Sequence, residues 1–338
     1  MFKKLFGRFK GKVASEPPFR LCDDAAPQSI EVEGVPLFSL GEHFVIEHRA
    51  VIFNWQSVYD WFDEGVPADV QPQAWCQCER AWLLHQRDCF GIAYQLAEDE
   101  QTYVLFSLEQ RHTELAMAFI ARTRKRIMHI LQGIADDNIW GKNILIICSD
   151  VDDYFSYIAA YHPRQEEIAR SSGIYINAGG GHFVTFGSDL SYIEPTIAHE
   201  LTHSYLSHLP LPHWLNEGIA VNVEQRLVGR MPGEFTAQEM YDKHQTHWNA
   251  QTIQAFWSGE AFSTQATMSL AYDLATTIVM QLSKDWAVFS QFVLAAHWAD
   301  AAAQAAQEYI GMSLGEYICL VLDKAYHADW EPAAFVRT

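Results

Sequence analysis

The sequence predicts an α+β fold, because strand-like segments are followed by a C-terminal part with helical patterning. Apolar residues indicate strands at 143–148, 173–177 and 182–187. From residue 265 onward the pattern is almost wholly helical, and alanine is frequent around 294–307. Apolar residues form 49% of the 338 residues and charged residues only 19%, which indicates a folded globular chain and not a disordered one.

The first twelve residues form a basic amphipathic segment. Five positive charges accompany apolar residues at helical spacing, namely Phe2, Leu5, Phe6 and Phe9. Such a segment can bind weakly to an anionic membrane surface, and the alternative is a mobile basic tail. No apolar run has the length of a membrane span, and the terminus lacks the apolar stretch of a secretion signal.

Cysteine spacing and net charge indicate the compartment and the partners. The cysteines are scattered, at positions 22, 76, 78, 89, 148 and 319. This spacing suits reduced thiols, so we expect a cytoplasmic protein whose residues 1–12 can touch the inner membrane surface. The net charge of −19 argues against nucleic acid as a partner, since a phosphate backbone would be repelled.

The patterning predicts three parts: a basic amphipathic terminus and irregular lead-in at 1–40, an α+β module of unknown role at 41–110, and a main domain at 111–338. In the module, 55–62 is predicted to be a helix, and 89–96 and 102–106 are predicted to form a hairpin. The main domain begins with an amphipathic helix at 111–134. Its apolar side is expected to hold Leu115, Phe119, Ile120, Ile127 and Leu131.

A His-Glu-Leu-Thr-His segment gives the strongest indication of chemistry. His199 and His203 are four residues apart, so both imidazoles can reach one metal ion from the same side of a helix. Glu200 lies beside them and can take a proton from a metal-bound water. Pro195 suits the opening turn of this helix. The alternative is a buried helix whose histidines are satisfied by hydrogen bonds.

A second helix after the prolines at 210 and 212 would offer a third ligand. If it folds back against the first, Glu217 reaches the same ion. Two histidines and a carboxylate leave a fourth position for water, as a catalytic zinc requires. His213 is a competing ligand, although its neighbours indicate a helix start and a place lining the cleft. Leu206 and Leu209 stand where a metzincin has glycine and histidine, so that class is not expected.

The segment His-Glu-Leu-Thr-His, followed by Trp-Leu-Asn-Glu-Gly-Ile-Ala at 214–220, resembles the gluzincin metallopeptidases. It is most similar to the peptidase MA-like group, with an aminopeptidase N-like Asn-Glu-Gly motif. The resemblance covers about 140–325. It implies a zincin-like domain, with a small mixed sheet, a zinc helix and a mostly helical C-terminal part. It also implies one Zn²⁺ held by His199, His203 and Glu217.

The resemblance implies peptide-bond hydrolysis, with Glu200 as base. Tyr272, in Ser-Leu-Ala-Tyr-Asp, matches the family tyrosine that hydrogen-bonds the oxyanion. A peptide or protein substrate is expected to extend along the free edge of strand 182–187. The residues expected to contact it are Gly180, Gly181, Phe183 and Thr185. Endopeptidase and aminopeptidase activity both stay open. The rival hypothesis is a non-catalytic or latent peptidase fold that acts as a binding or regulatory protein.

Overall fold

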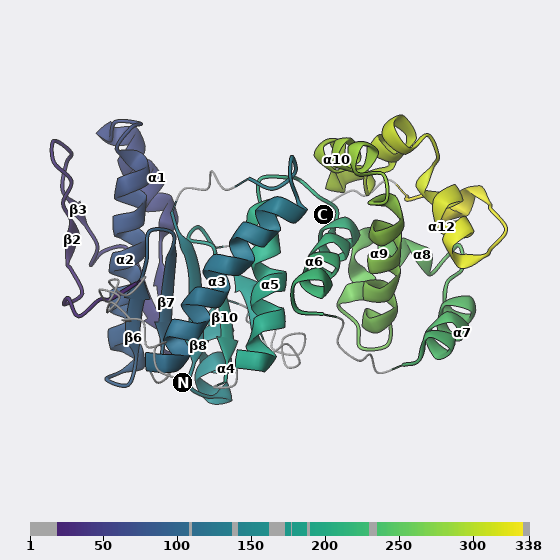
Figure 1. Cartoon of the computed structure of the whole chain (residues 1–338). Helices are drawn as coiled ribbons and strands as arrows, with labels where there is room; N and C mark the ends of the chain where they lie inside the picture. Colours follow the sequence, from purple (N-terminus) through teal and green to yellow (C-terminus); the bar gives the residue numbers. More distant parts are fainter. Residues whose placement is uncertain are drawn as a thin grey trace, which may run out of the picture.

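The computed structural model describes residues 19–107, 110–136, 141–161, 173–176, 178–187, 190–229 and 235–333. The described part combines a six-stranded mixed sheet with many helices, in agreement with the α+β class (Figure 1). The strand order is β1-β6-β7-β8-β10-β9. The strands are β1 (Arg20–Leu21), β6 (Gln95–Glu98), β7 (Thr102–Phe106), β8 (Asn143–Cys148), β9 (Gly173–Ile176) and β10 (His182–Phe186).

The sheet crosses the boundary predicted at residue 110. Strand β7 lies before that boundary and β8 after it, yet they pair in parallel from Thr102↔Asn143 to Phe106↔Ile147. The separate module at 41–110 is therefore wrong as a division of the chain. Two small hairpins lie between β1 and β6 in the sequence: β2 (Ser29–Ile30) with β3 (Phe38–Ser39), and β4 (Phe44–Glu47) with β5 (Ala50–Phe53).

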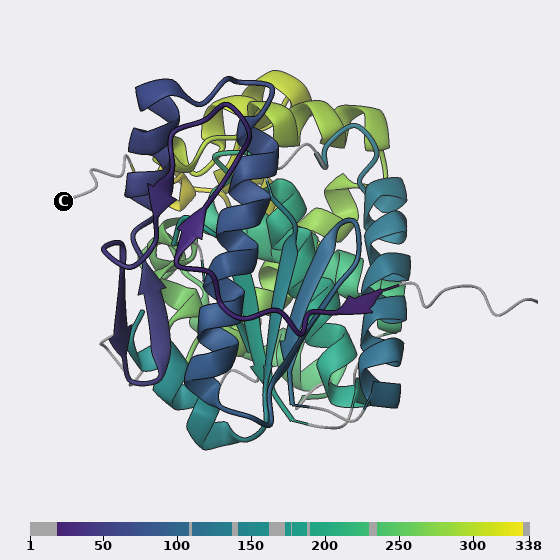
Figure 2. The same ribbon diagram turned by 90° about the vertical axis from the view of Figure 1, so that its left-hand side faces the viewer.

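Helices cover both faces of the sheet (Figure 2). One face packs against α1 (Trp55–Gly65), α2 (Gln71–Phe90) and α4 (Val151–Ala159), and the other against α3 (Gln110–Ile130) and α5 (Leu190–Leu206). The predicted hairpin is confirmed over Gln95–Phe106, but Cys89 and Phe90 end α2. On the predicted apolar side of α3 all the named residues are buried except Leu115, which is 51% exposed.

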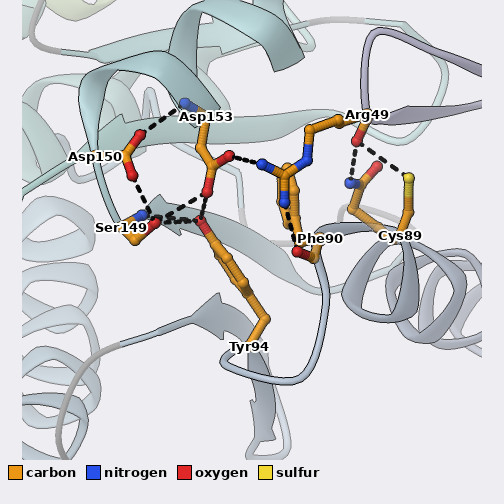
Figure 3. A network of polar contacts seen from close by, with 8 residues as sticks. Arg49, Cys89, Phe90, Tyr94, Ser149, Asp150 and Asp153 are labelled. Carbon is orange, nitrogen blue, oxygen red and sulfur yellow. Dashed lines mark hydrogen bonds and ion pairs between the residues drawn. The ribbon is translucent and has the colours of Figure 1, made fainter.

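A buried carboxylate joins the hairpin turn at 48–49 to the sheet (Figure 3). The guanidinium of Arg49 donates to Asp153 in α4 and to the carbonyl of Phe90. Asp153 also accepts hydrogen bonds from the Tyr94 hydroxyl at 2.7 Å and the Ser149 hydroxyl at 2.9 Å. The hairpin turn, the residue before β6 and the residue after β8 thus meet at the Asp153 side chain of α4, which supports treating 41–110 and the sheet as one structure.

The C-terminal half is helical and has a core of its own, centred on fully buried residues such as Trp214, Phe256 and Phe292. This confirms the helical pattern predicted from 265 onward. Its elements are α6 (His213–Val228), α7 (Ala237–His247), α8 (Ile253–Ser258), α9 (Met268–Leu282), α10 (Trp286–Ala295), α11 (Ala303–Ala305) and α12 (Leu314–Leu322), with short turns η1 (Glu260–Phe262), η2 (Trp298–Asp300), η3 (Ala306–Ile310) and η4 (Ala328–Trp330).

Within the described ranges, no helix combines the length and apolar character that crossing a bilayer requires. The basic segment predicted at 1–12 lies outside the described residues.

Glu79 in α2 makes stability depend on pH. The carboxylate accepts hydrogen bonds from the Trp75 indole at 2.8 Å and from the Lys142 amide at 3.0 Å. Burial nevertheless raises its pKa to about 8. A raised carboxyl pKa means that the folded state holds the proton longer than the unfolded state. The stability contribution is therefore full below the unfolded pKa of about 4.5 and is lost as pH rises toward 8.

We expect the difference in unfolding free energy between the native chain and Glu79→Gln to change by about 1.4 kcal/mol per pH unit between pH 5 and 8. Urea unfolding at four pH values measures this difference. Glu64→Gln, on exposed α1 surface, is the control and should show no slope. Parallel pH profiles for the native chain and Glu79→Gln would contradict the assignment.

Candidate metal centre

Helix α5 carries the two predicted histidine ligands. It runs from Leu190 to Leu206, so Pro195 lies inside the helix and not in its opening turn. The predicted start was wrong because the helix extends further toward the N-terminus, and a proline in this place removes one backbone hydrogen bond. The predicted end is confirmed, and α6 begins at His213 after the proline-bearing turn.

The structure brings His199, His203 and Glu217 together. One ligand atom from each lies within 4.8 Å of the others. Helices α5 and α6 pack closely, and Glu217 reaches back from the second turn of α6. Its Oε2 lies 3.2 Å from Nε2 of His199, and its Oε1 lies 3.5 Å from Nε2 of His203. This group of side chains could hold one metal ion.

Two hydrogen-bond acceptors outside the cluster of His199, His203 and Glu217 orient the two imidazoles. Nδ1 of His199 lies 3.1 Å from Oε2 of Glu224, and Nδ1 of His203 lies 3.1 Å from Oδ1 of Asn216. Since these oxygens accept hydrogen bonds, each Nδ1 carries a hydrogen. Nε2 is then the nitrogen of each ring that faces Glu217 and could bind a metal ion. Metal-binding histidines are commonly held by an acceptor in this way.

Neither Glu224 nor Asn216 was predicted from the sequence to take part in the site. Glu224 lies seven residues after Glu217, so a helix places both carboxylates on one side. That spacing was a usable signal. Asn216 belongs to the Asn-Glu-Gly motif, from which only the glutamate was predicted to take part in the site.

The charges at the centre are strongly coupled. Burial lowers the pKa of His199, but the carboxylates of Glu217 and Glu224 outweigh it and raise that pKa to about 10. Burial raises the pKa of Glu217, yet the two histidines hold it well below its ordinary value. Burial raises the pKa of Glu200, and the nearby histidine charges only partly oppose this. Glu200 is therefore more basic than an exposed glutamate.

Tyr272 reaches the centre from α9. Its hydroxyl donates a hydrogen bond to Glu217, and burial together with the charges of Glu217 and Glu200 raises its pKa.

Gly218 explains the close approach of α6 and α9. A Cβ there would lie 2.7 Å from the carbonyl oxygen of Ala275 in α9, so α9 could not pack as it does. The Asn-Glu-Gly motif thus contributes in three ways. Asn216 accepts a hydrogen bond from His203, Glu217 is a candidate metal ligand, and Gly218 lets α6 and α9 pack closely.

The competing histidines lie differently. Nδ1 of His213 is 3.9 Å from Oε1 of Glu217, and its side chain is 47% exposed. It lines the site at the start of α6, with its ring edge-on against Phe262. His208 is exposed beyond the end of α5.

The free edge predicted for 182–187 was wrong. Strand β10 pairs with β8 on one side and with β9 on the other, so its backbone is not open to a substrate. Thr185 and Phe183 are buried between these strands. Among the described residues β9 is the outer strand at this end of the sheet. The sequence pattern could not reveal this, because strand order depends on long-range pairing.

Gly180 and Gly181 lie in the turn between β9 and β10. A Cβ at Gly180 would meet the ring of Trp55, at 2.4 Å from its nearest atom. At Gly181 it would meet the hydroxyl of Tyr175, at 2.1 Å. These glycines therefore allow close packing of the turn, and a contact between them and a substrate stays a prediction.

Comparison with protein-family models, curated proteins and solved structures finds no match.

Removing the carboxylate of Glu224 should weaken metal binding without abolishing it. We expect Glu224→Gln to lower the affinity for Zn²⁺ by about 10–100-fold, because the Nδ1–H of His199 loses its charged acceptor. Competition with a chromophoric chelator measures the affinity. Glu239→Gln in the capping box of α7 is the matched control and should leave it unchanged. Equal affinities for the native chain and Glu224→Gln would contradict a role in orienting His199.

Proposed function

We propose that the chain is a zinc-dependent peptidase with a zincin-like domain. The observation that carries this is the convergence of His199, His203 and Glu217 beside an intact, partly buried Glu200. A group kept only for binding would not require a base in this position. The motif resemblance to gluzincins supports the same function.

The donor set suits zinc. Two imidazole nitrogens and one carboxylate are typical of catalytic zinc sites, and the Nδ1–H groups are already held by outer acceptors. A zinc ion held there would polarise a substrate carbonyl and lower the pKa of a bound water to about 7.

The remaining chemistry belongs to two side chains. Glu200 accepts the proton of the attacking water and returns it to the leaving amine, a role favoured by its raised pKa. Tyr272 keeps its proton, since its pKa is raised, and donates a hydrogen bond to the oxyanion.

A peptide substrate would approach the centre beside β9, the outer strand of the described sheet, which packs against α5. We also propose a cytoplasmic location, because all six cysteines are free.

Zinc content together with cleavage of a mixed peptide library tests this proposal. The expected result is one zinc per chain and cleavage that a chelator stops and added zinc restores. Internal cleavage would indicate an endopeptidase, and loss of single N-terminal residues an aminopeptidase. Zinc bound without any cleavage would favour the rival, a peptidase fold used for binding or regulation.

A further inference from the structure

The side-chain amide of Asn222 joins the helix of Glu217 to the helix of Tyr272, and the two helices lie side by side (Figure 1). Its Nδ2 donates to the carbonyl of Gly218 in α6 at 2.7 Å and to the carbonyl of Thr276 in α9 at 3.0 Å. An amide nitrogen carries two hydrogens, so each helix accepts one of them. Asn222 therefore connects α6 and α9 through two backbone carbonyls.

These carbonyls lie close in the sequence to the residues of the proposed chemistry. Gly218 directly follows Glu217, and Thr276 lies about one helical turn after Tyr272. The hydroxyl of Thr276 also donates to the carbonyl of Tyr272 at 2.6 Å. Asn222 thus reaches the backbone beside Glu217 on one helix and, through Thr276, the backbone of Tyr272 on the other.

A chain of ring contacts connects the Tyr272 side chain to the centre. The Tyr272 ring is edge-on to the ring of Phe262, with 5.1 Å between their centroids. The ring of Phe262 is edge-on to that of His213 at 4.8 Å, and Nδ1 of His213 lies 3.9 Å from Oε1 of Glu217. The position of α9 therefore decides where the Tyr272 hydroxyl lies relative to the centre.

Apolar packing holds α6 and α9 together without fixing their register. Ile219 of α6 and Ile278 of α9 are buried in the same core. Hydrophobic contact is non-directional, so it opposes separation of the helices more than sliding along their axes. A hydrogen bond tolerates only a narrow range of distance and angle, so the two bonds of Asn222 oppose sliding.

The geometry points to Asn222 as a positioning residue that fixes the place of Tyr272 relative to Glu217. This inference rests on the proposed function, in which Tyr272 donates a hydrogen bond to the oxyanion. Such a donor acts only within hydrogen-bond distance, and a displacement of about 1 Å can cost about 100-fold in rate. Asn222 is not one of the three clustered donors, so its effect passes through Tyr272 and not through the metal ion.

Kinetics on a cleaved peptide test this role. Asn222→Ala should lower kcat about tenfold, because α9 loses the bond that sets its register. KM and the affinity for Zn²⁺ should stay within about twofold, because the lost interaction serves the transition state alone. In a Tyr272→Phe background the effect of Asn222→Ala should shrink to less than about twofold, since the group that it positions is already gone.

Asn222→Ser separates the two hydrogen bonds. A serine hydroxyl can bond the carbonyl four residues earlier, so the bond to Gly218 is kept, but its side chain is too short for the bond to Thr276. We therefore expect Asn222→Ser to lose as much kcat as Asn222→Ala. Asn249→Ala is the control, because it removes hydrogen bonds to the amides of Gln251 and Thr252 before α8, and it should keep the native kcat.

Three kinetic results would overturn the inference. The first is a kcat of Asn222→Ala equal to that of Asn249→Ala, and the second is native kcat in Asn222→Ser. The third is an undiminished effect of Asn222→Ala in the Tyr272→Phe background, which would show that Asn222 does not act through Tyr272.

A fluorine resonance gives a readout that needs no turnover. With Tyr272 alone replaced by 3-fluorotyrosine, the resonance should shift in Asn222→Ala and Asn222→Ser and stay in place in Asn249→Ala. An unshifted resonance in the Asn222 variants would overturn the inference. If the native chain binds zinc but cleaves no peptide, the proposed function fails by itself, and the fluorine resonance still decides whether Asn222 positions Tyr272.

Discussion

Glu200→Gln is expected to abolish turnover while the chain still binds zinc. The amide has nearly the same shape as the carboxylate but cannot accept a proton, so kcat should fall by at least about 10²–10⁴-fold. Zinc affinity should change little, because Glu200 is not one of the three clustered donors. Peptide hydrolysis and metal content, measured on the same preparation, check this.

Glu194→Gln provides a matched control, because it makes the same change on the same helix outside the cluster. It should keep full activity. Activity retained in Glu200→Gln would remove the base from the mechanism, and activity lost equally in both variants would point to damage to α5.

Glu217→Gln is expected to cost the chain its metal ion. A neutral amide oxygen is a much weaker zinc ligand than a carboxylate, so the affinity loss should exceed the roughly 10–100-fold expected for an outer partner. The substitution also leaves two partly buried imidazoles without their shared carboxylate. Breaking a buried ion pair costs about 3–5 kcal/mol, so the metal-free protein should also melt earlier.

His213→Gln distinguishes the two possible third ligands. His213 is half exposed and lies 3.9 Å from Glu217, so we expect its replacement to leave zinc affinity unchanged. Titration with Zn²⁺, followed by calorimetry, compares the two variants. Loss of zinc in His213→Gln with full binding in Glu217→Gln would exchange their roles.

Local sequence patterns predicted helical spacing, the end of a helix and one buried strand. The spacing of His199 and His203, the prolines at 210 and 212 and the strand at 143–148 all reflect backbone periodicity or helix termination. Glu217 could be placed because the turn between α5 and α6 is short. When the connection is short, two consecutive helices must pack side by side.

Long-range features were not predictable in the same way. The pairing of β7 with β8, which removes the boundary at residue 110, joins residues about forty positions apart. Strand β9 pairs with the edge of β10 that was predicted to be free. This pairing depends on strand order and not on the residue pattern of either strand. Glu224 matters only because α6 packs against α5, so its role appears once the packing is known.

Anomalous diffraction at the zinc edge, from crystals grown with excess Zn²⁺, tests the central claim most directly. The expected result is one peak bonded to Nε2 of His199, Nε2 of His203 and a carboxylate oxygen of Glu217, at about 2.0–2.2 Å. A chain that binds no zinc between these side chains at saturating metal, or that binds it with Glu217 turned away, would contradict the account.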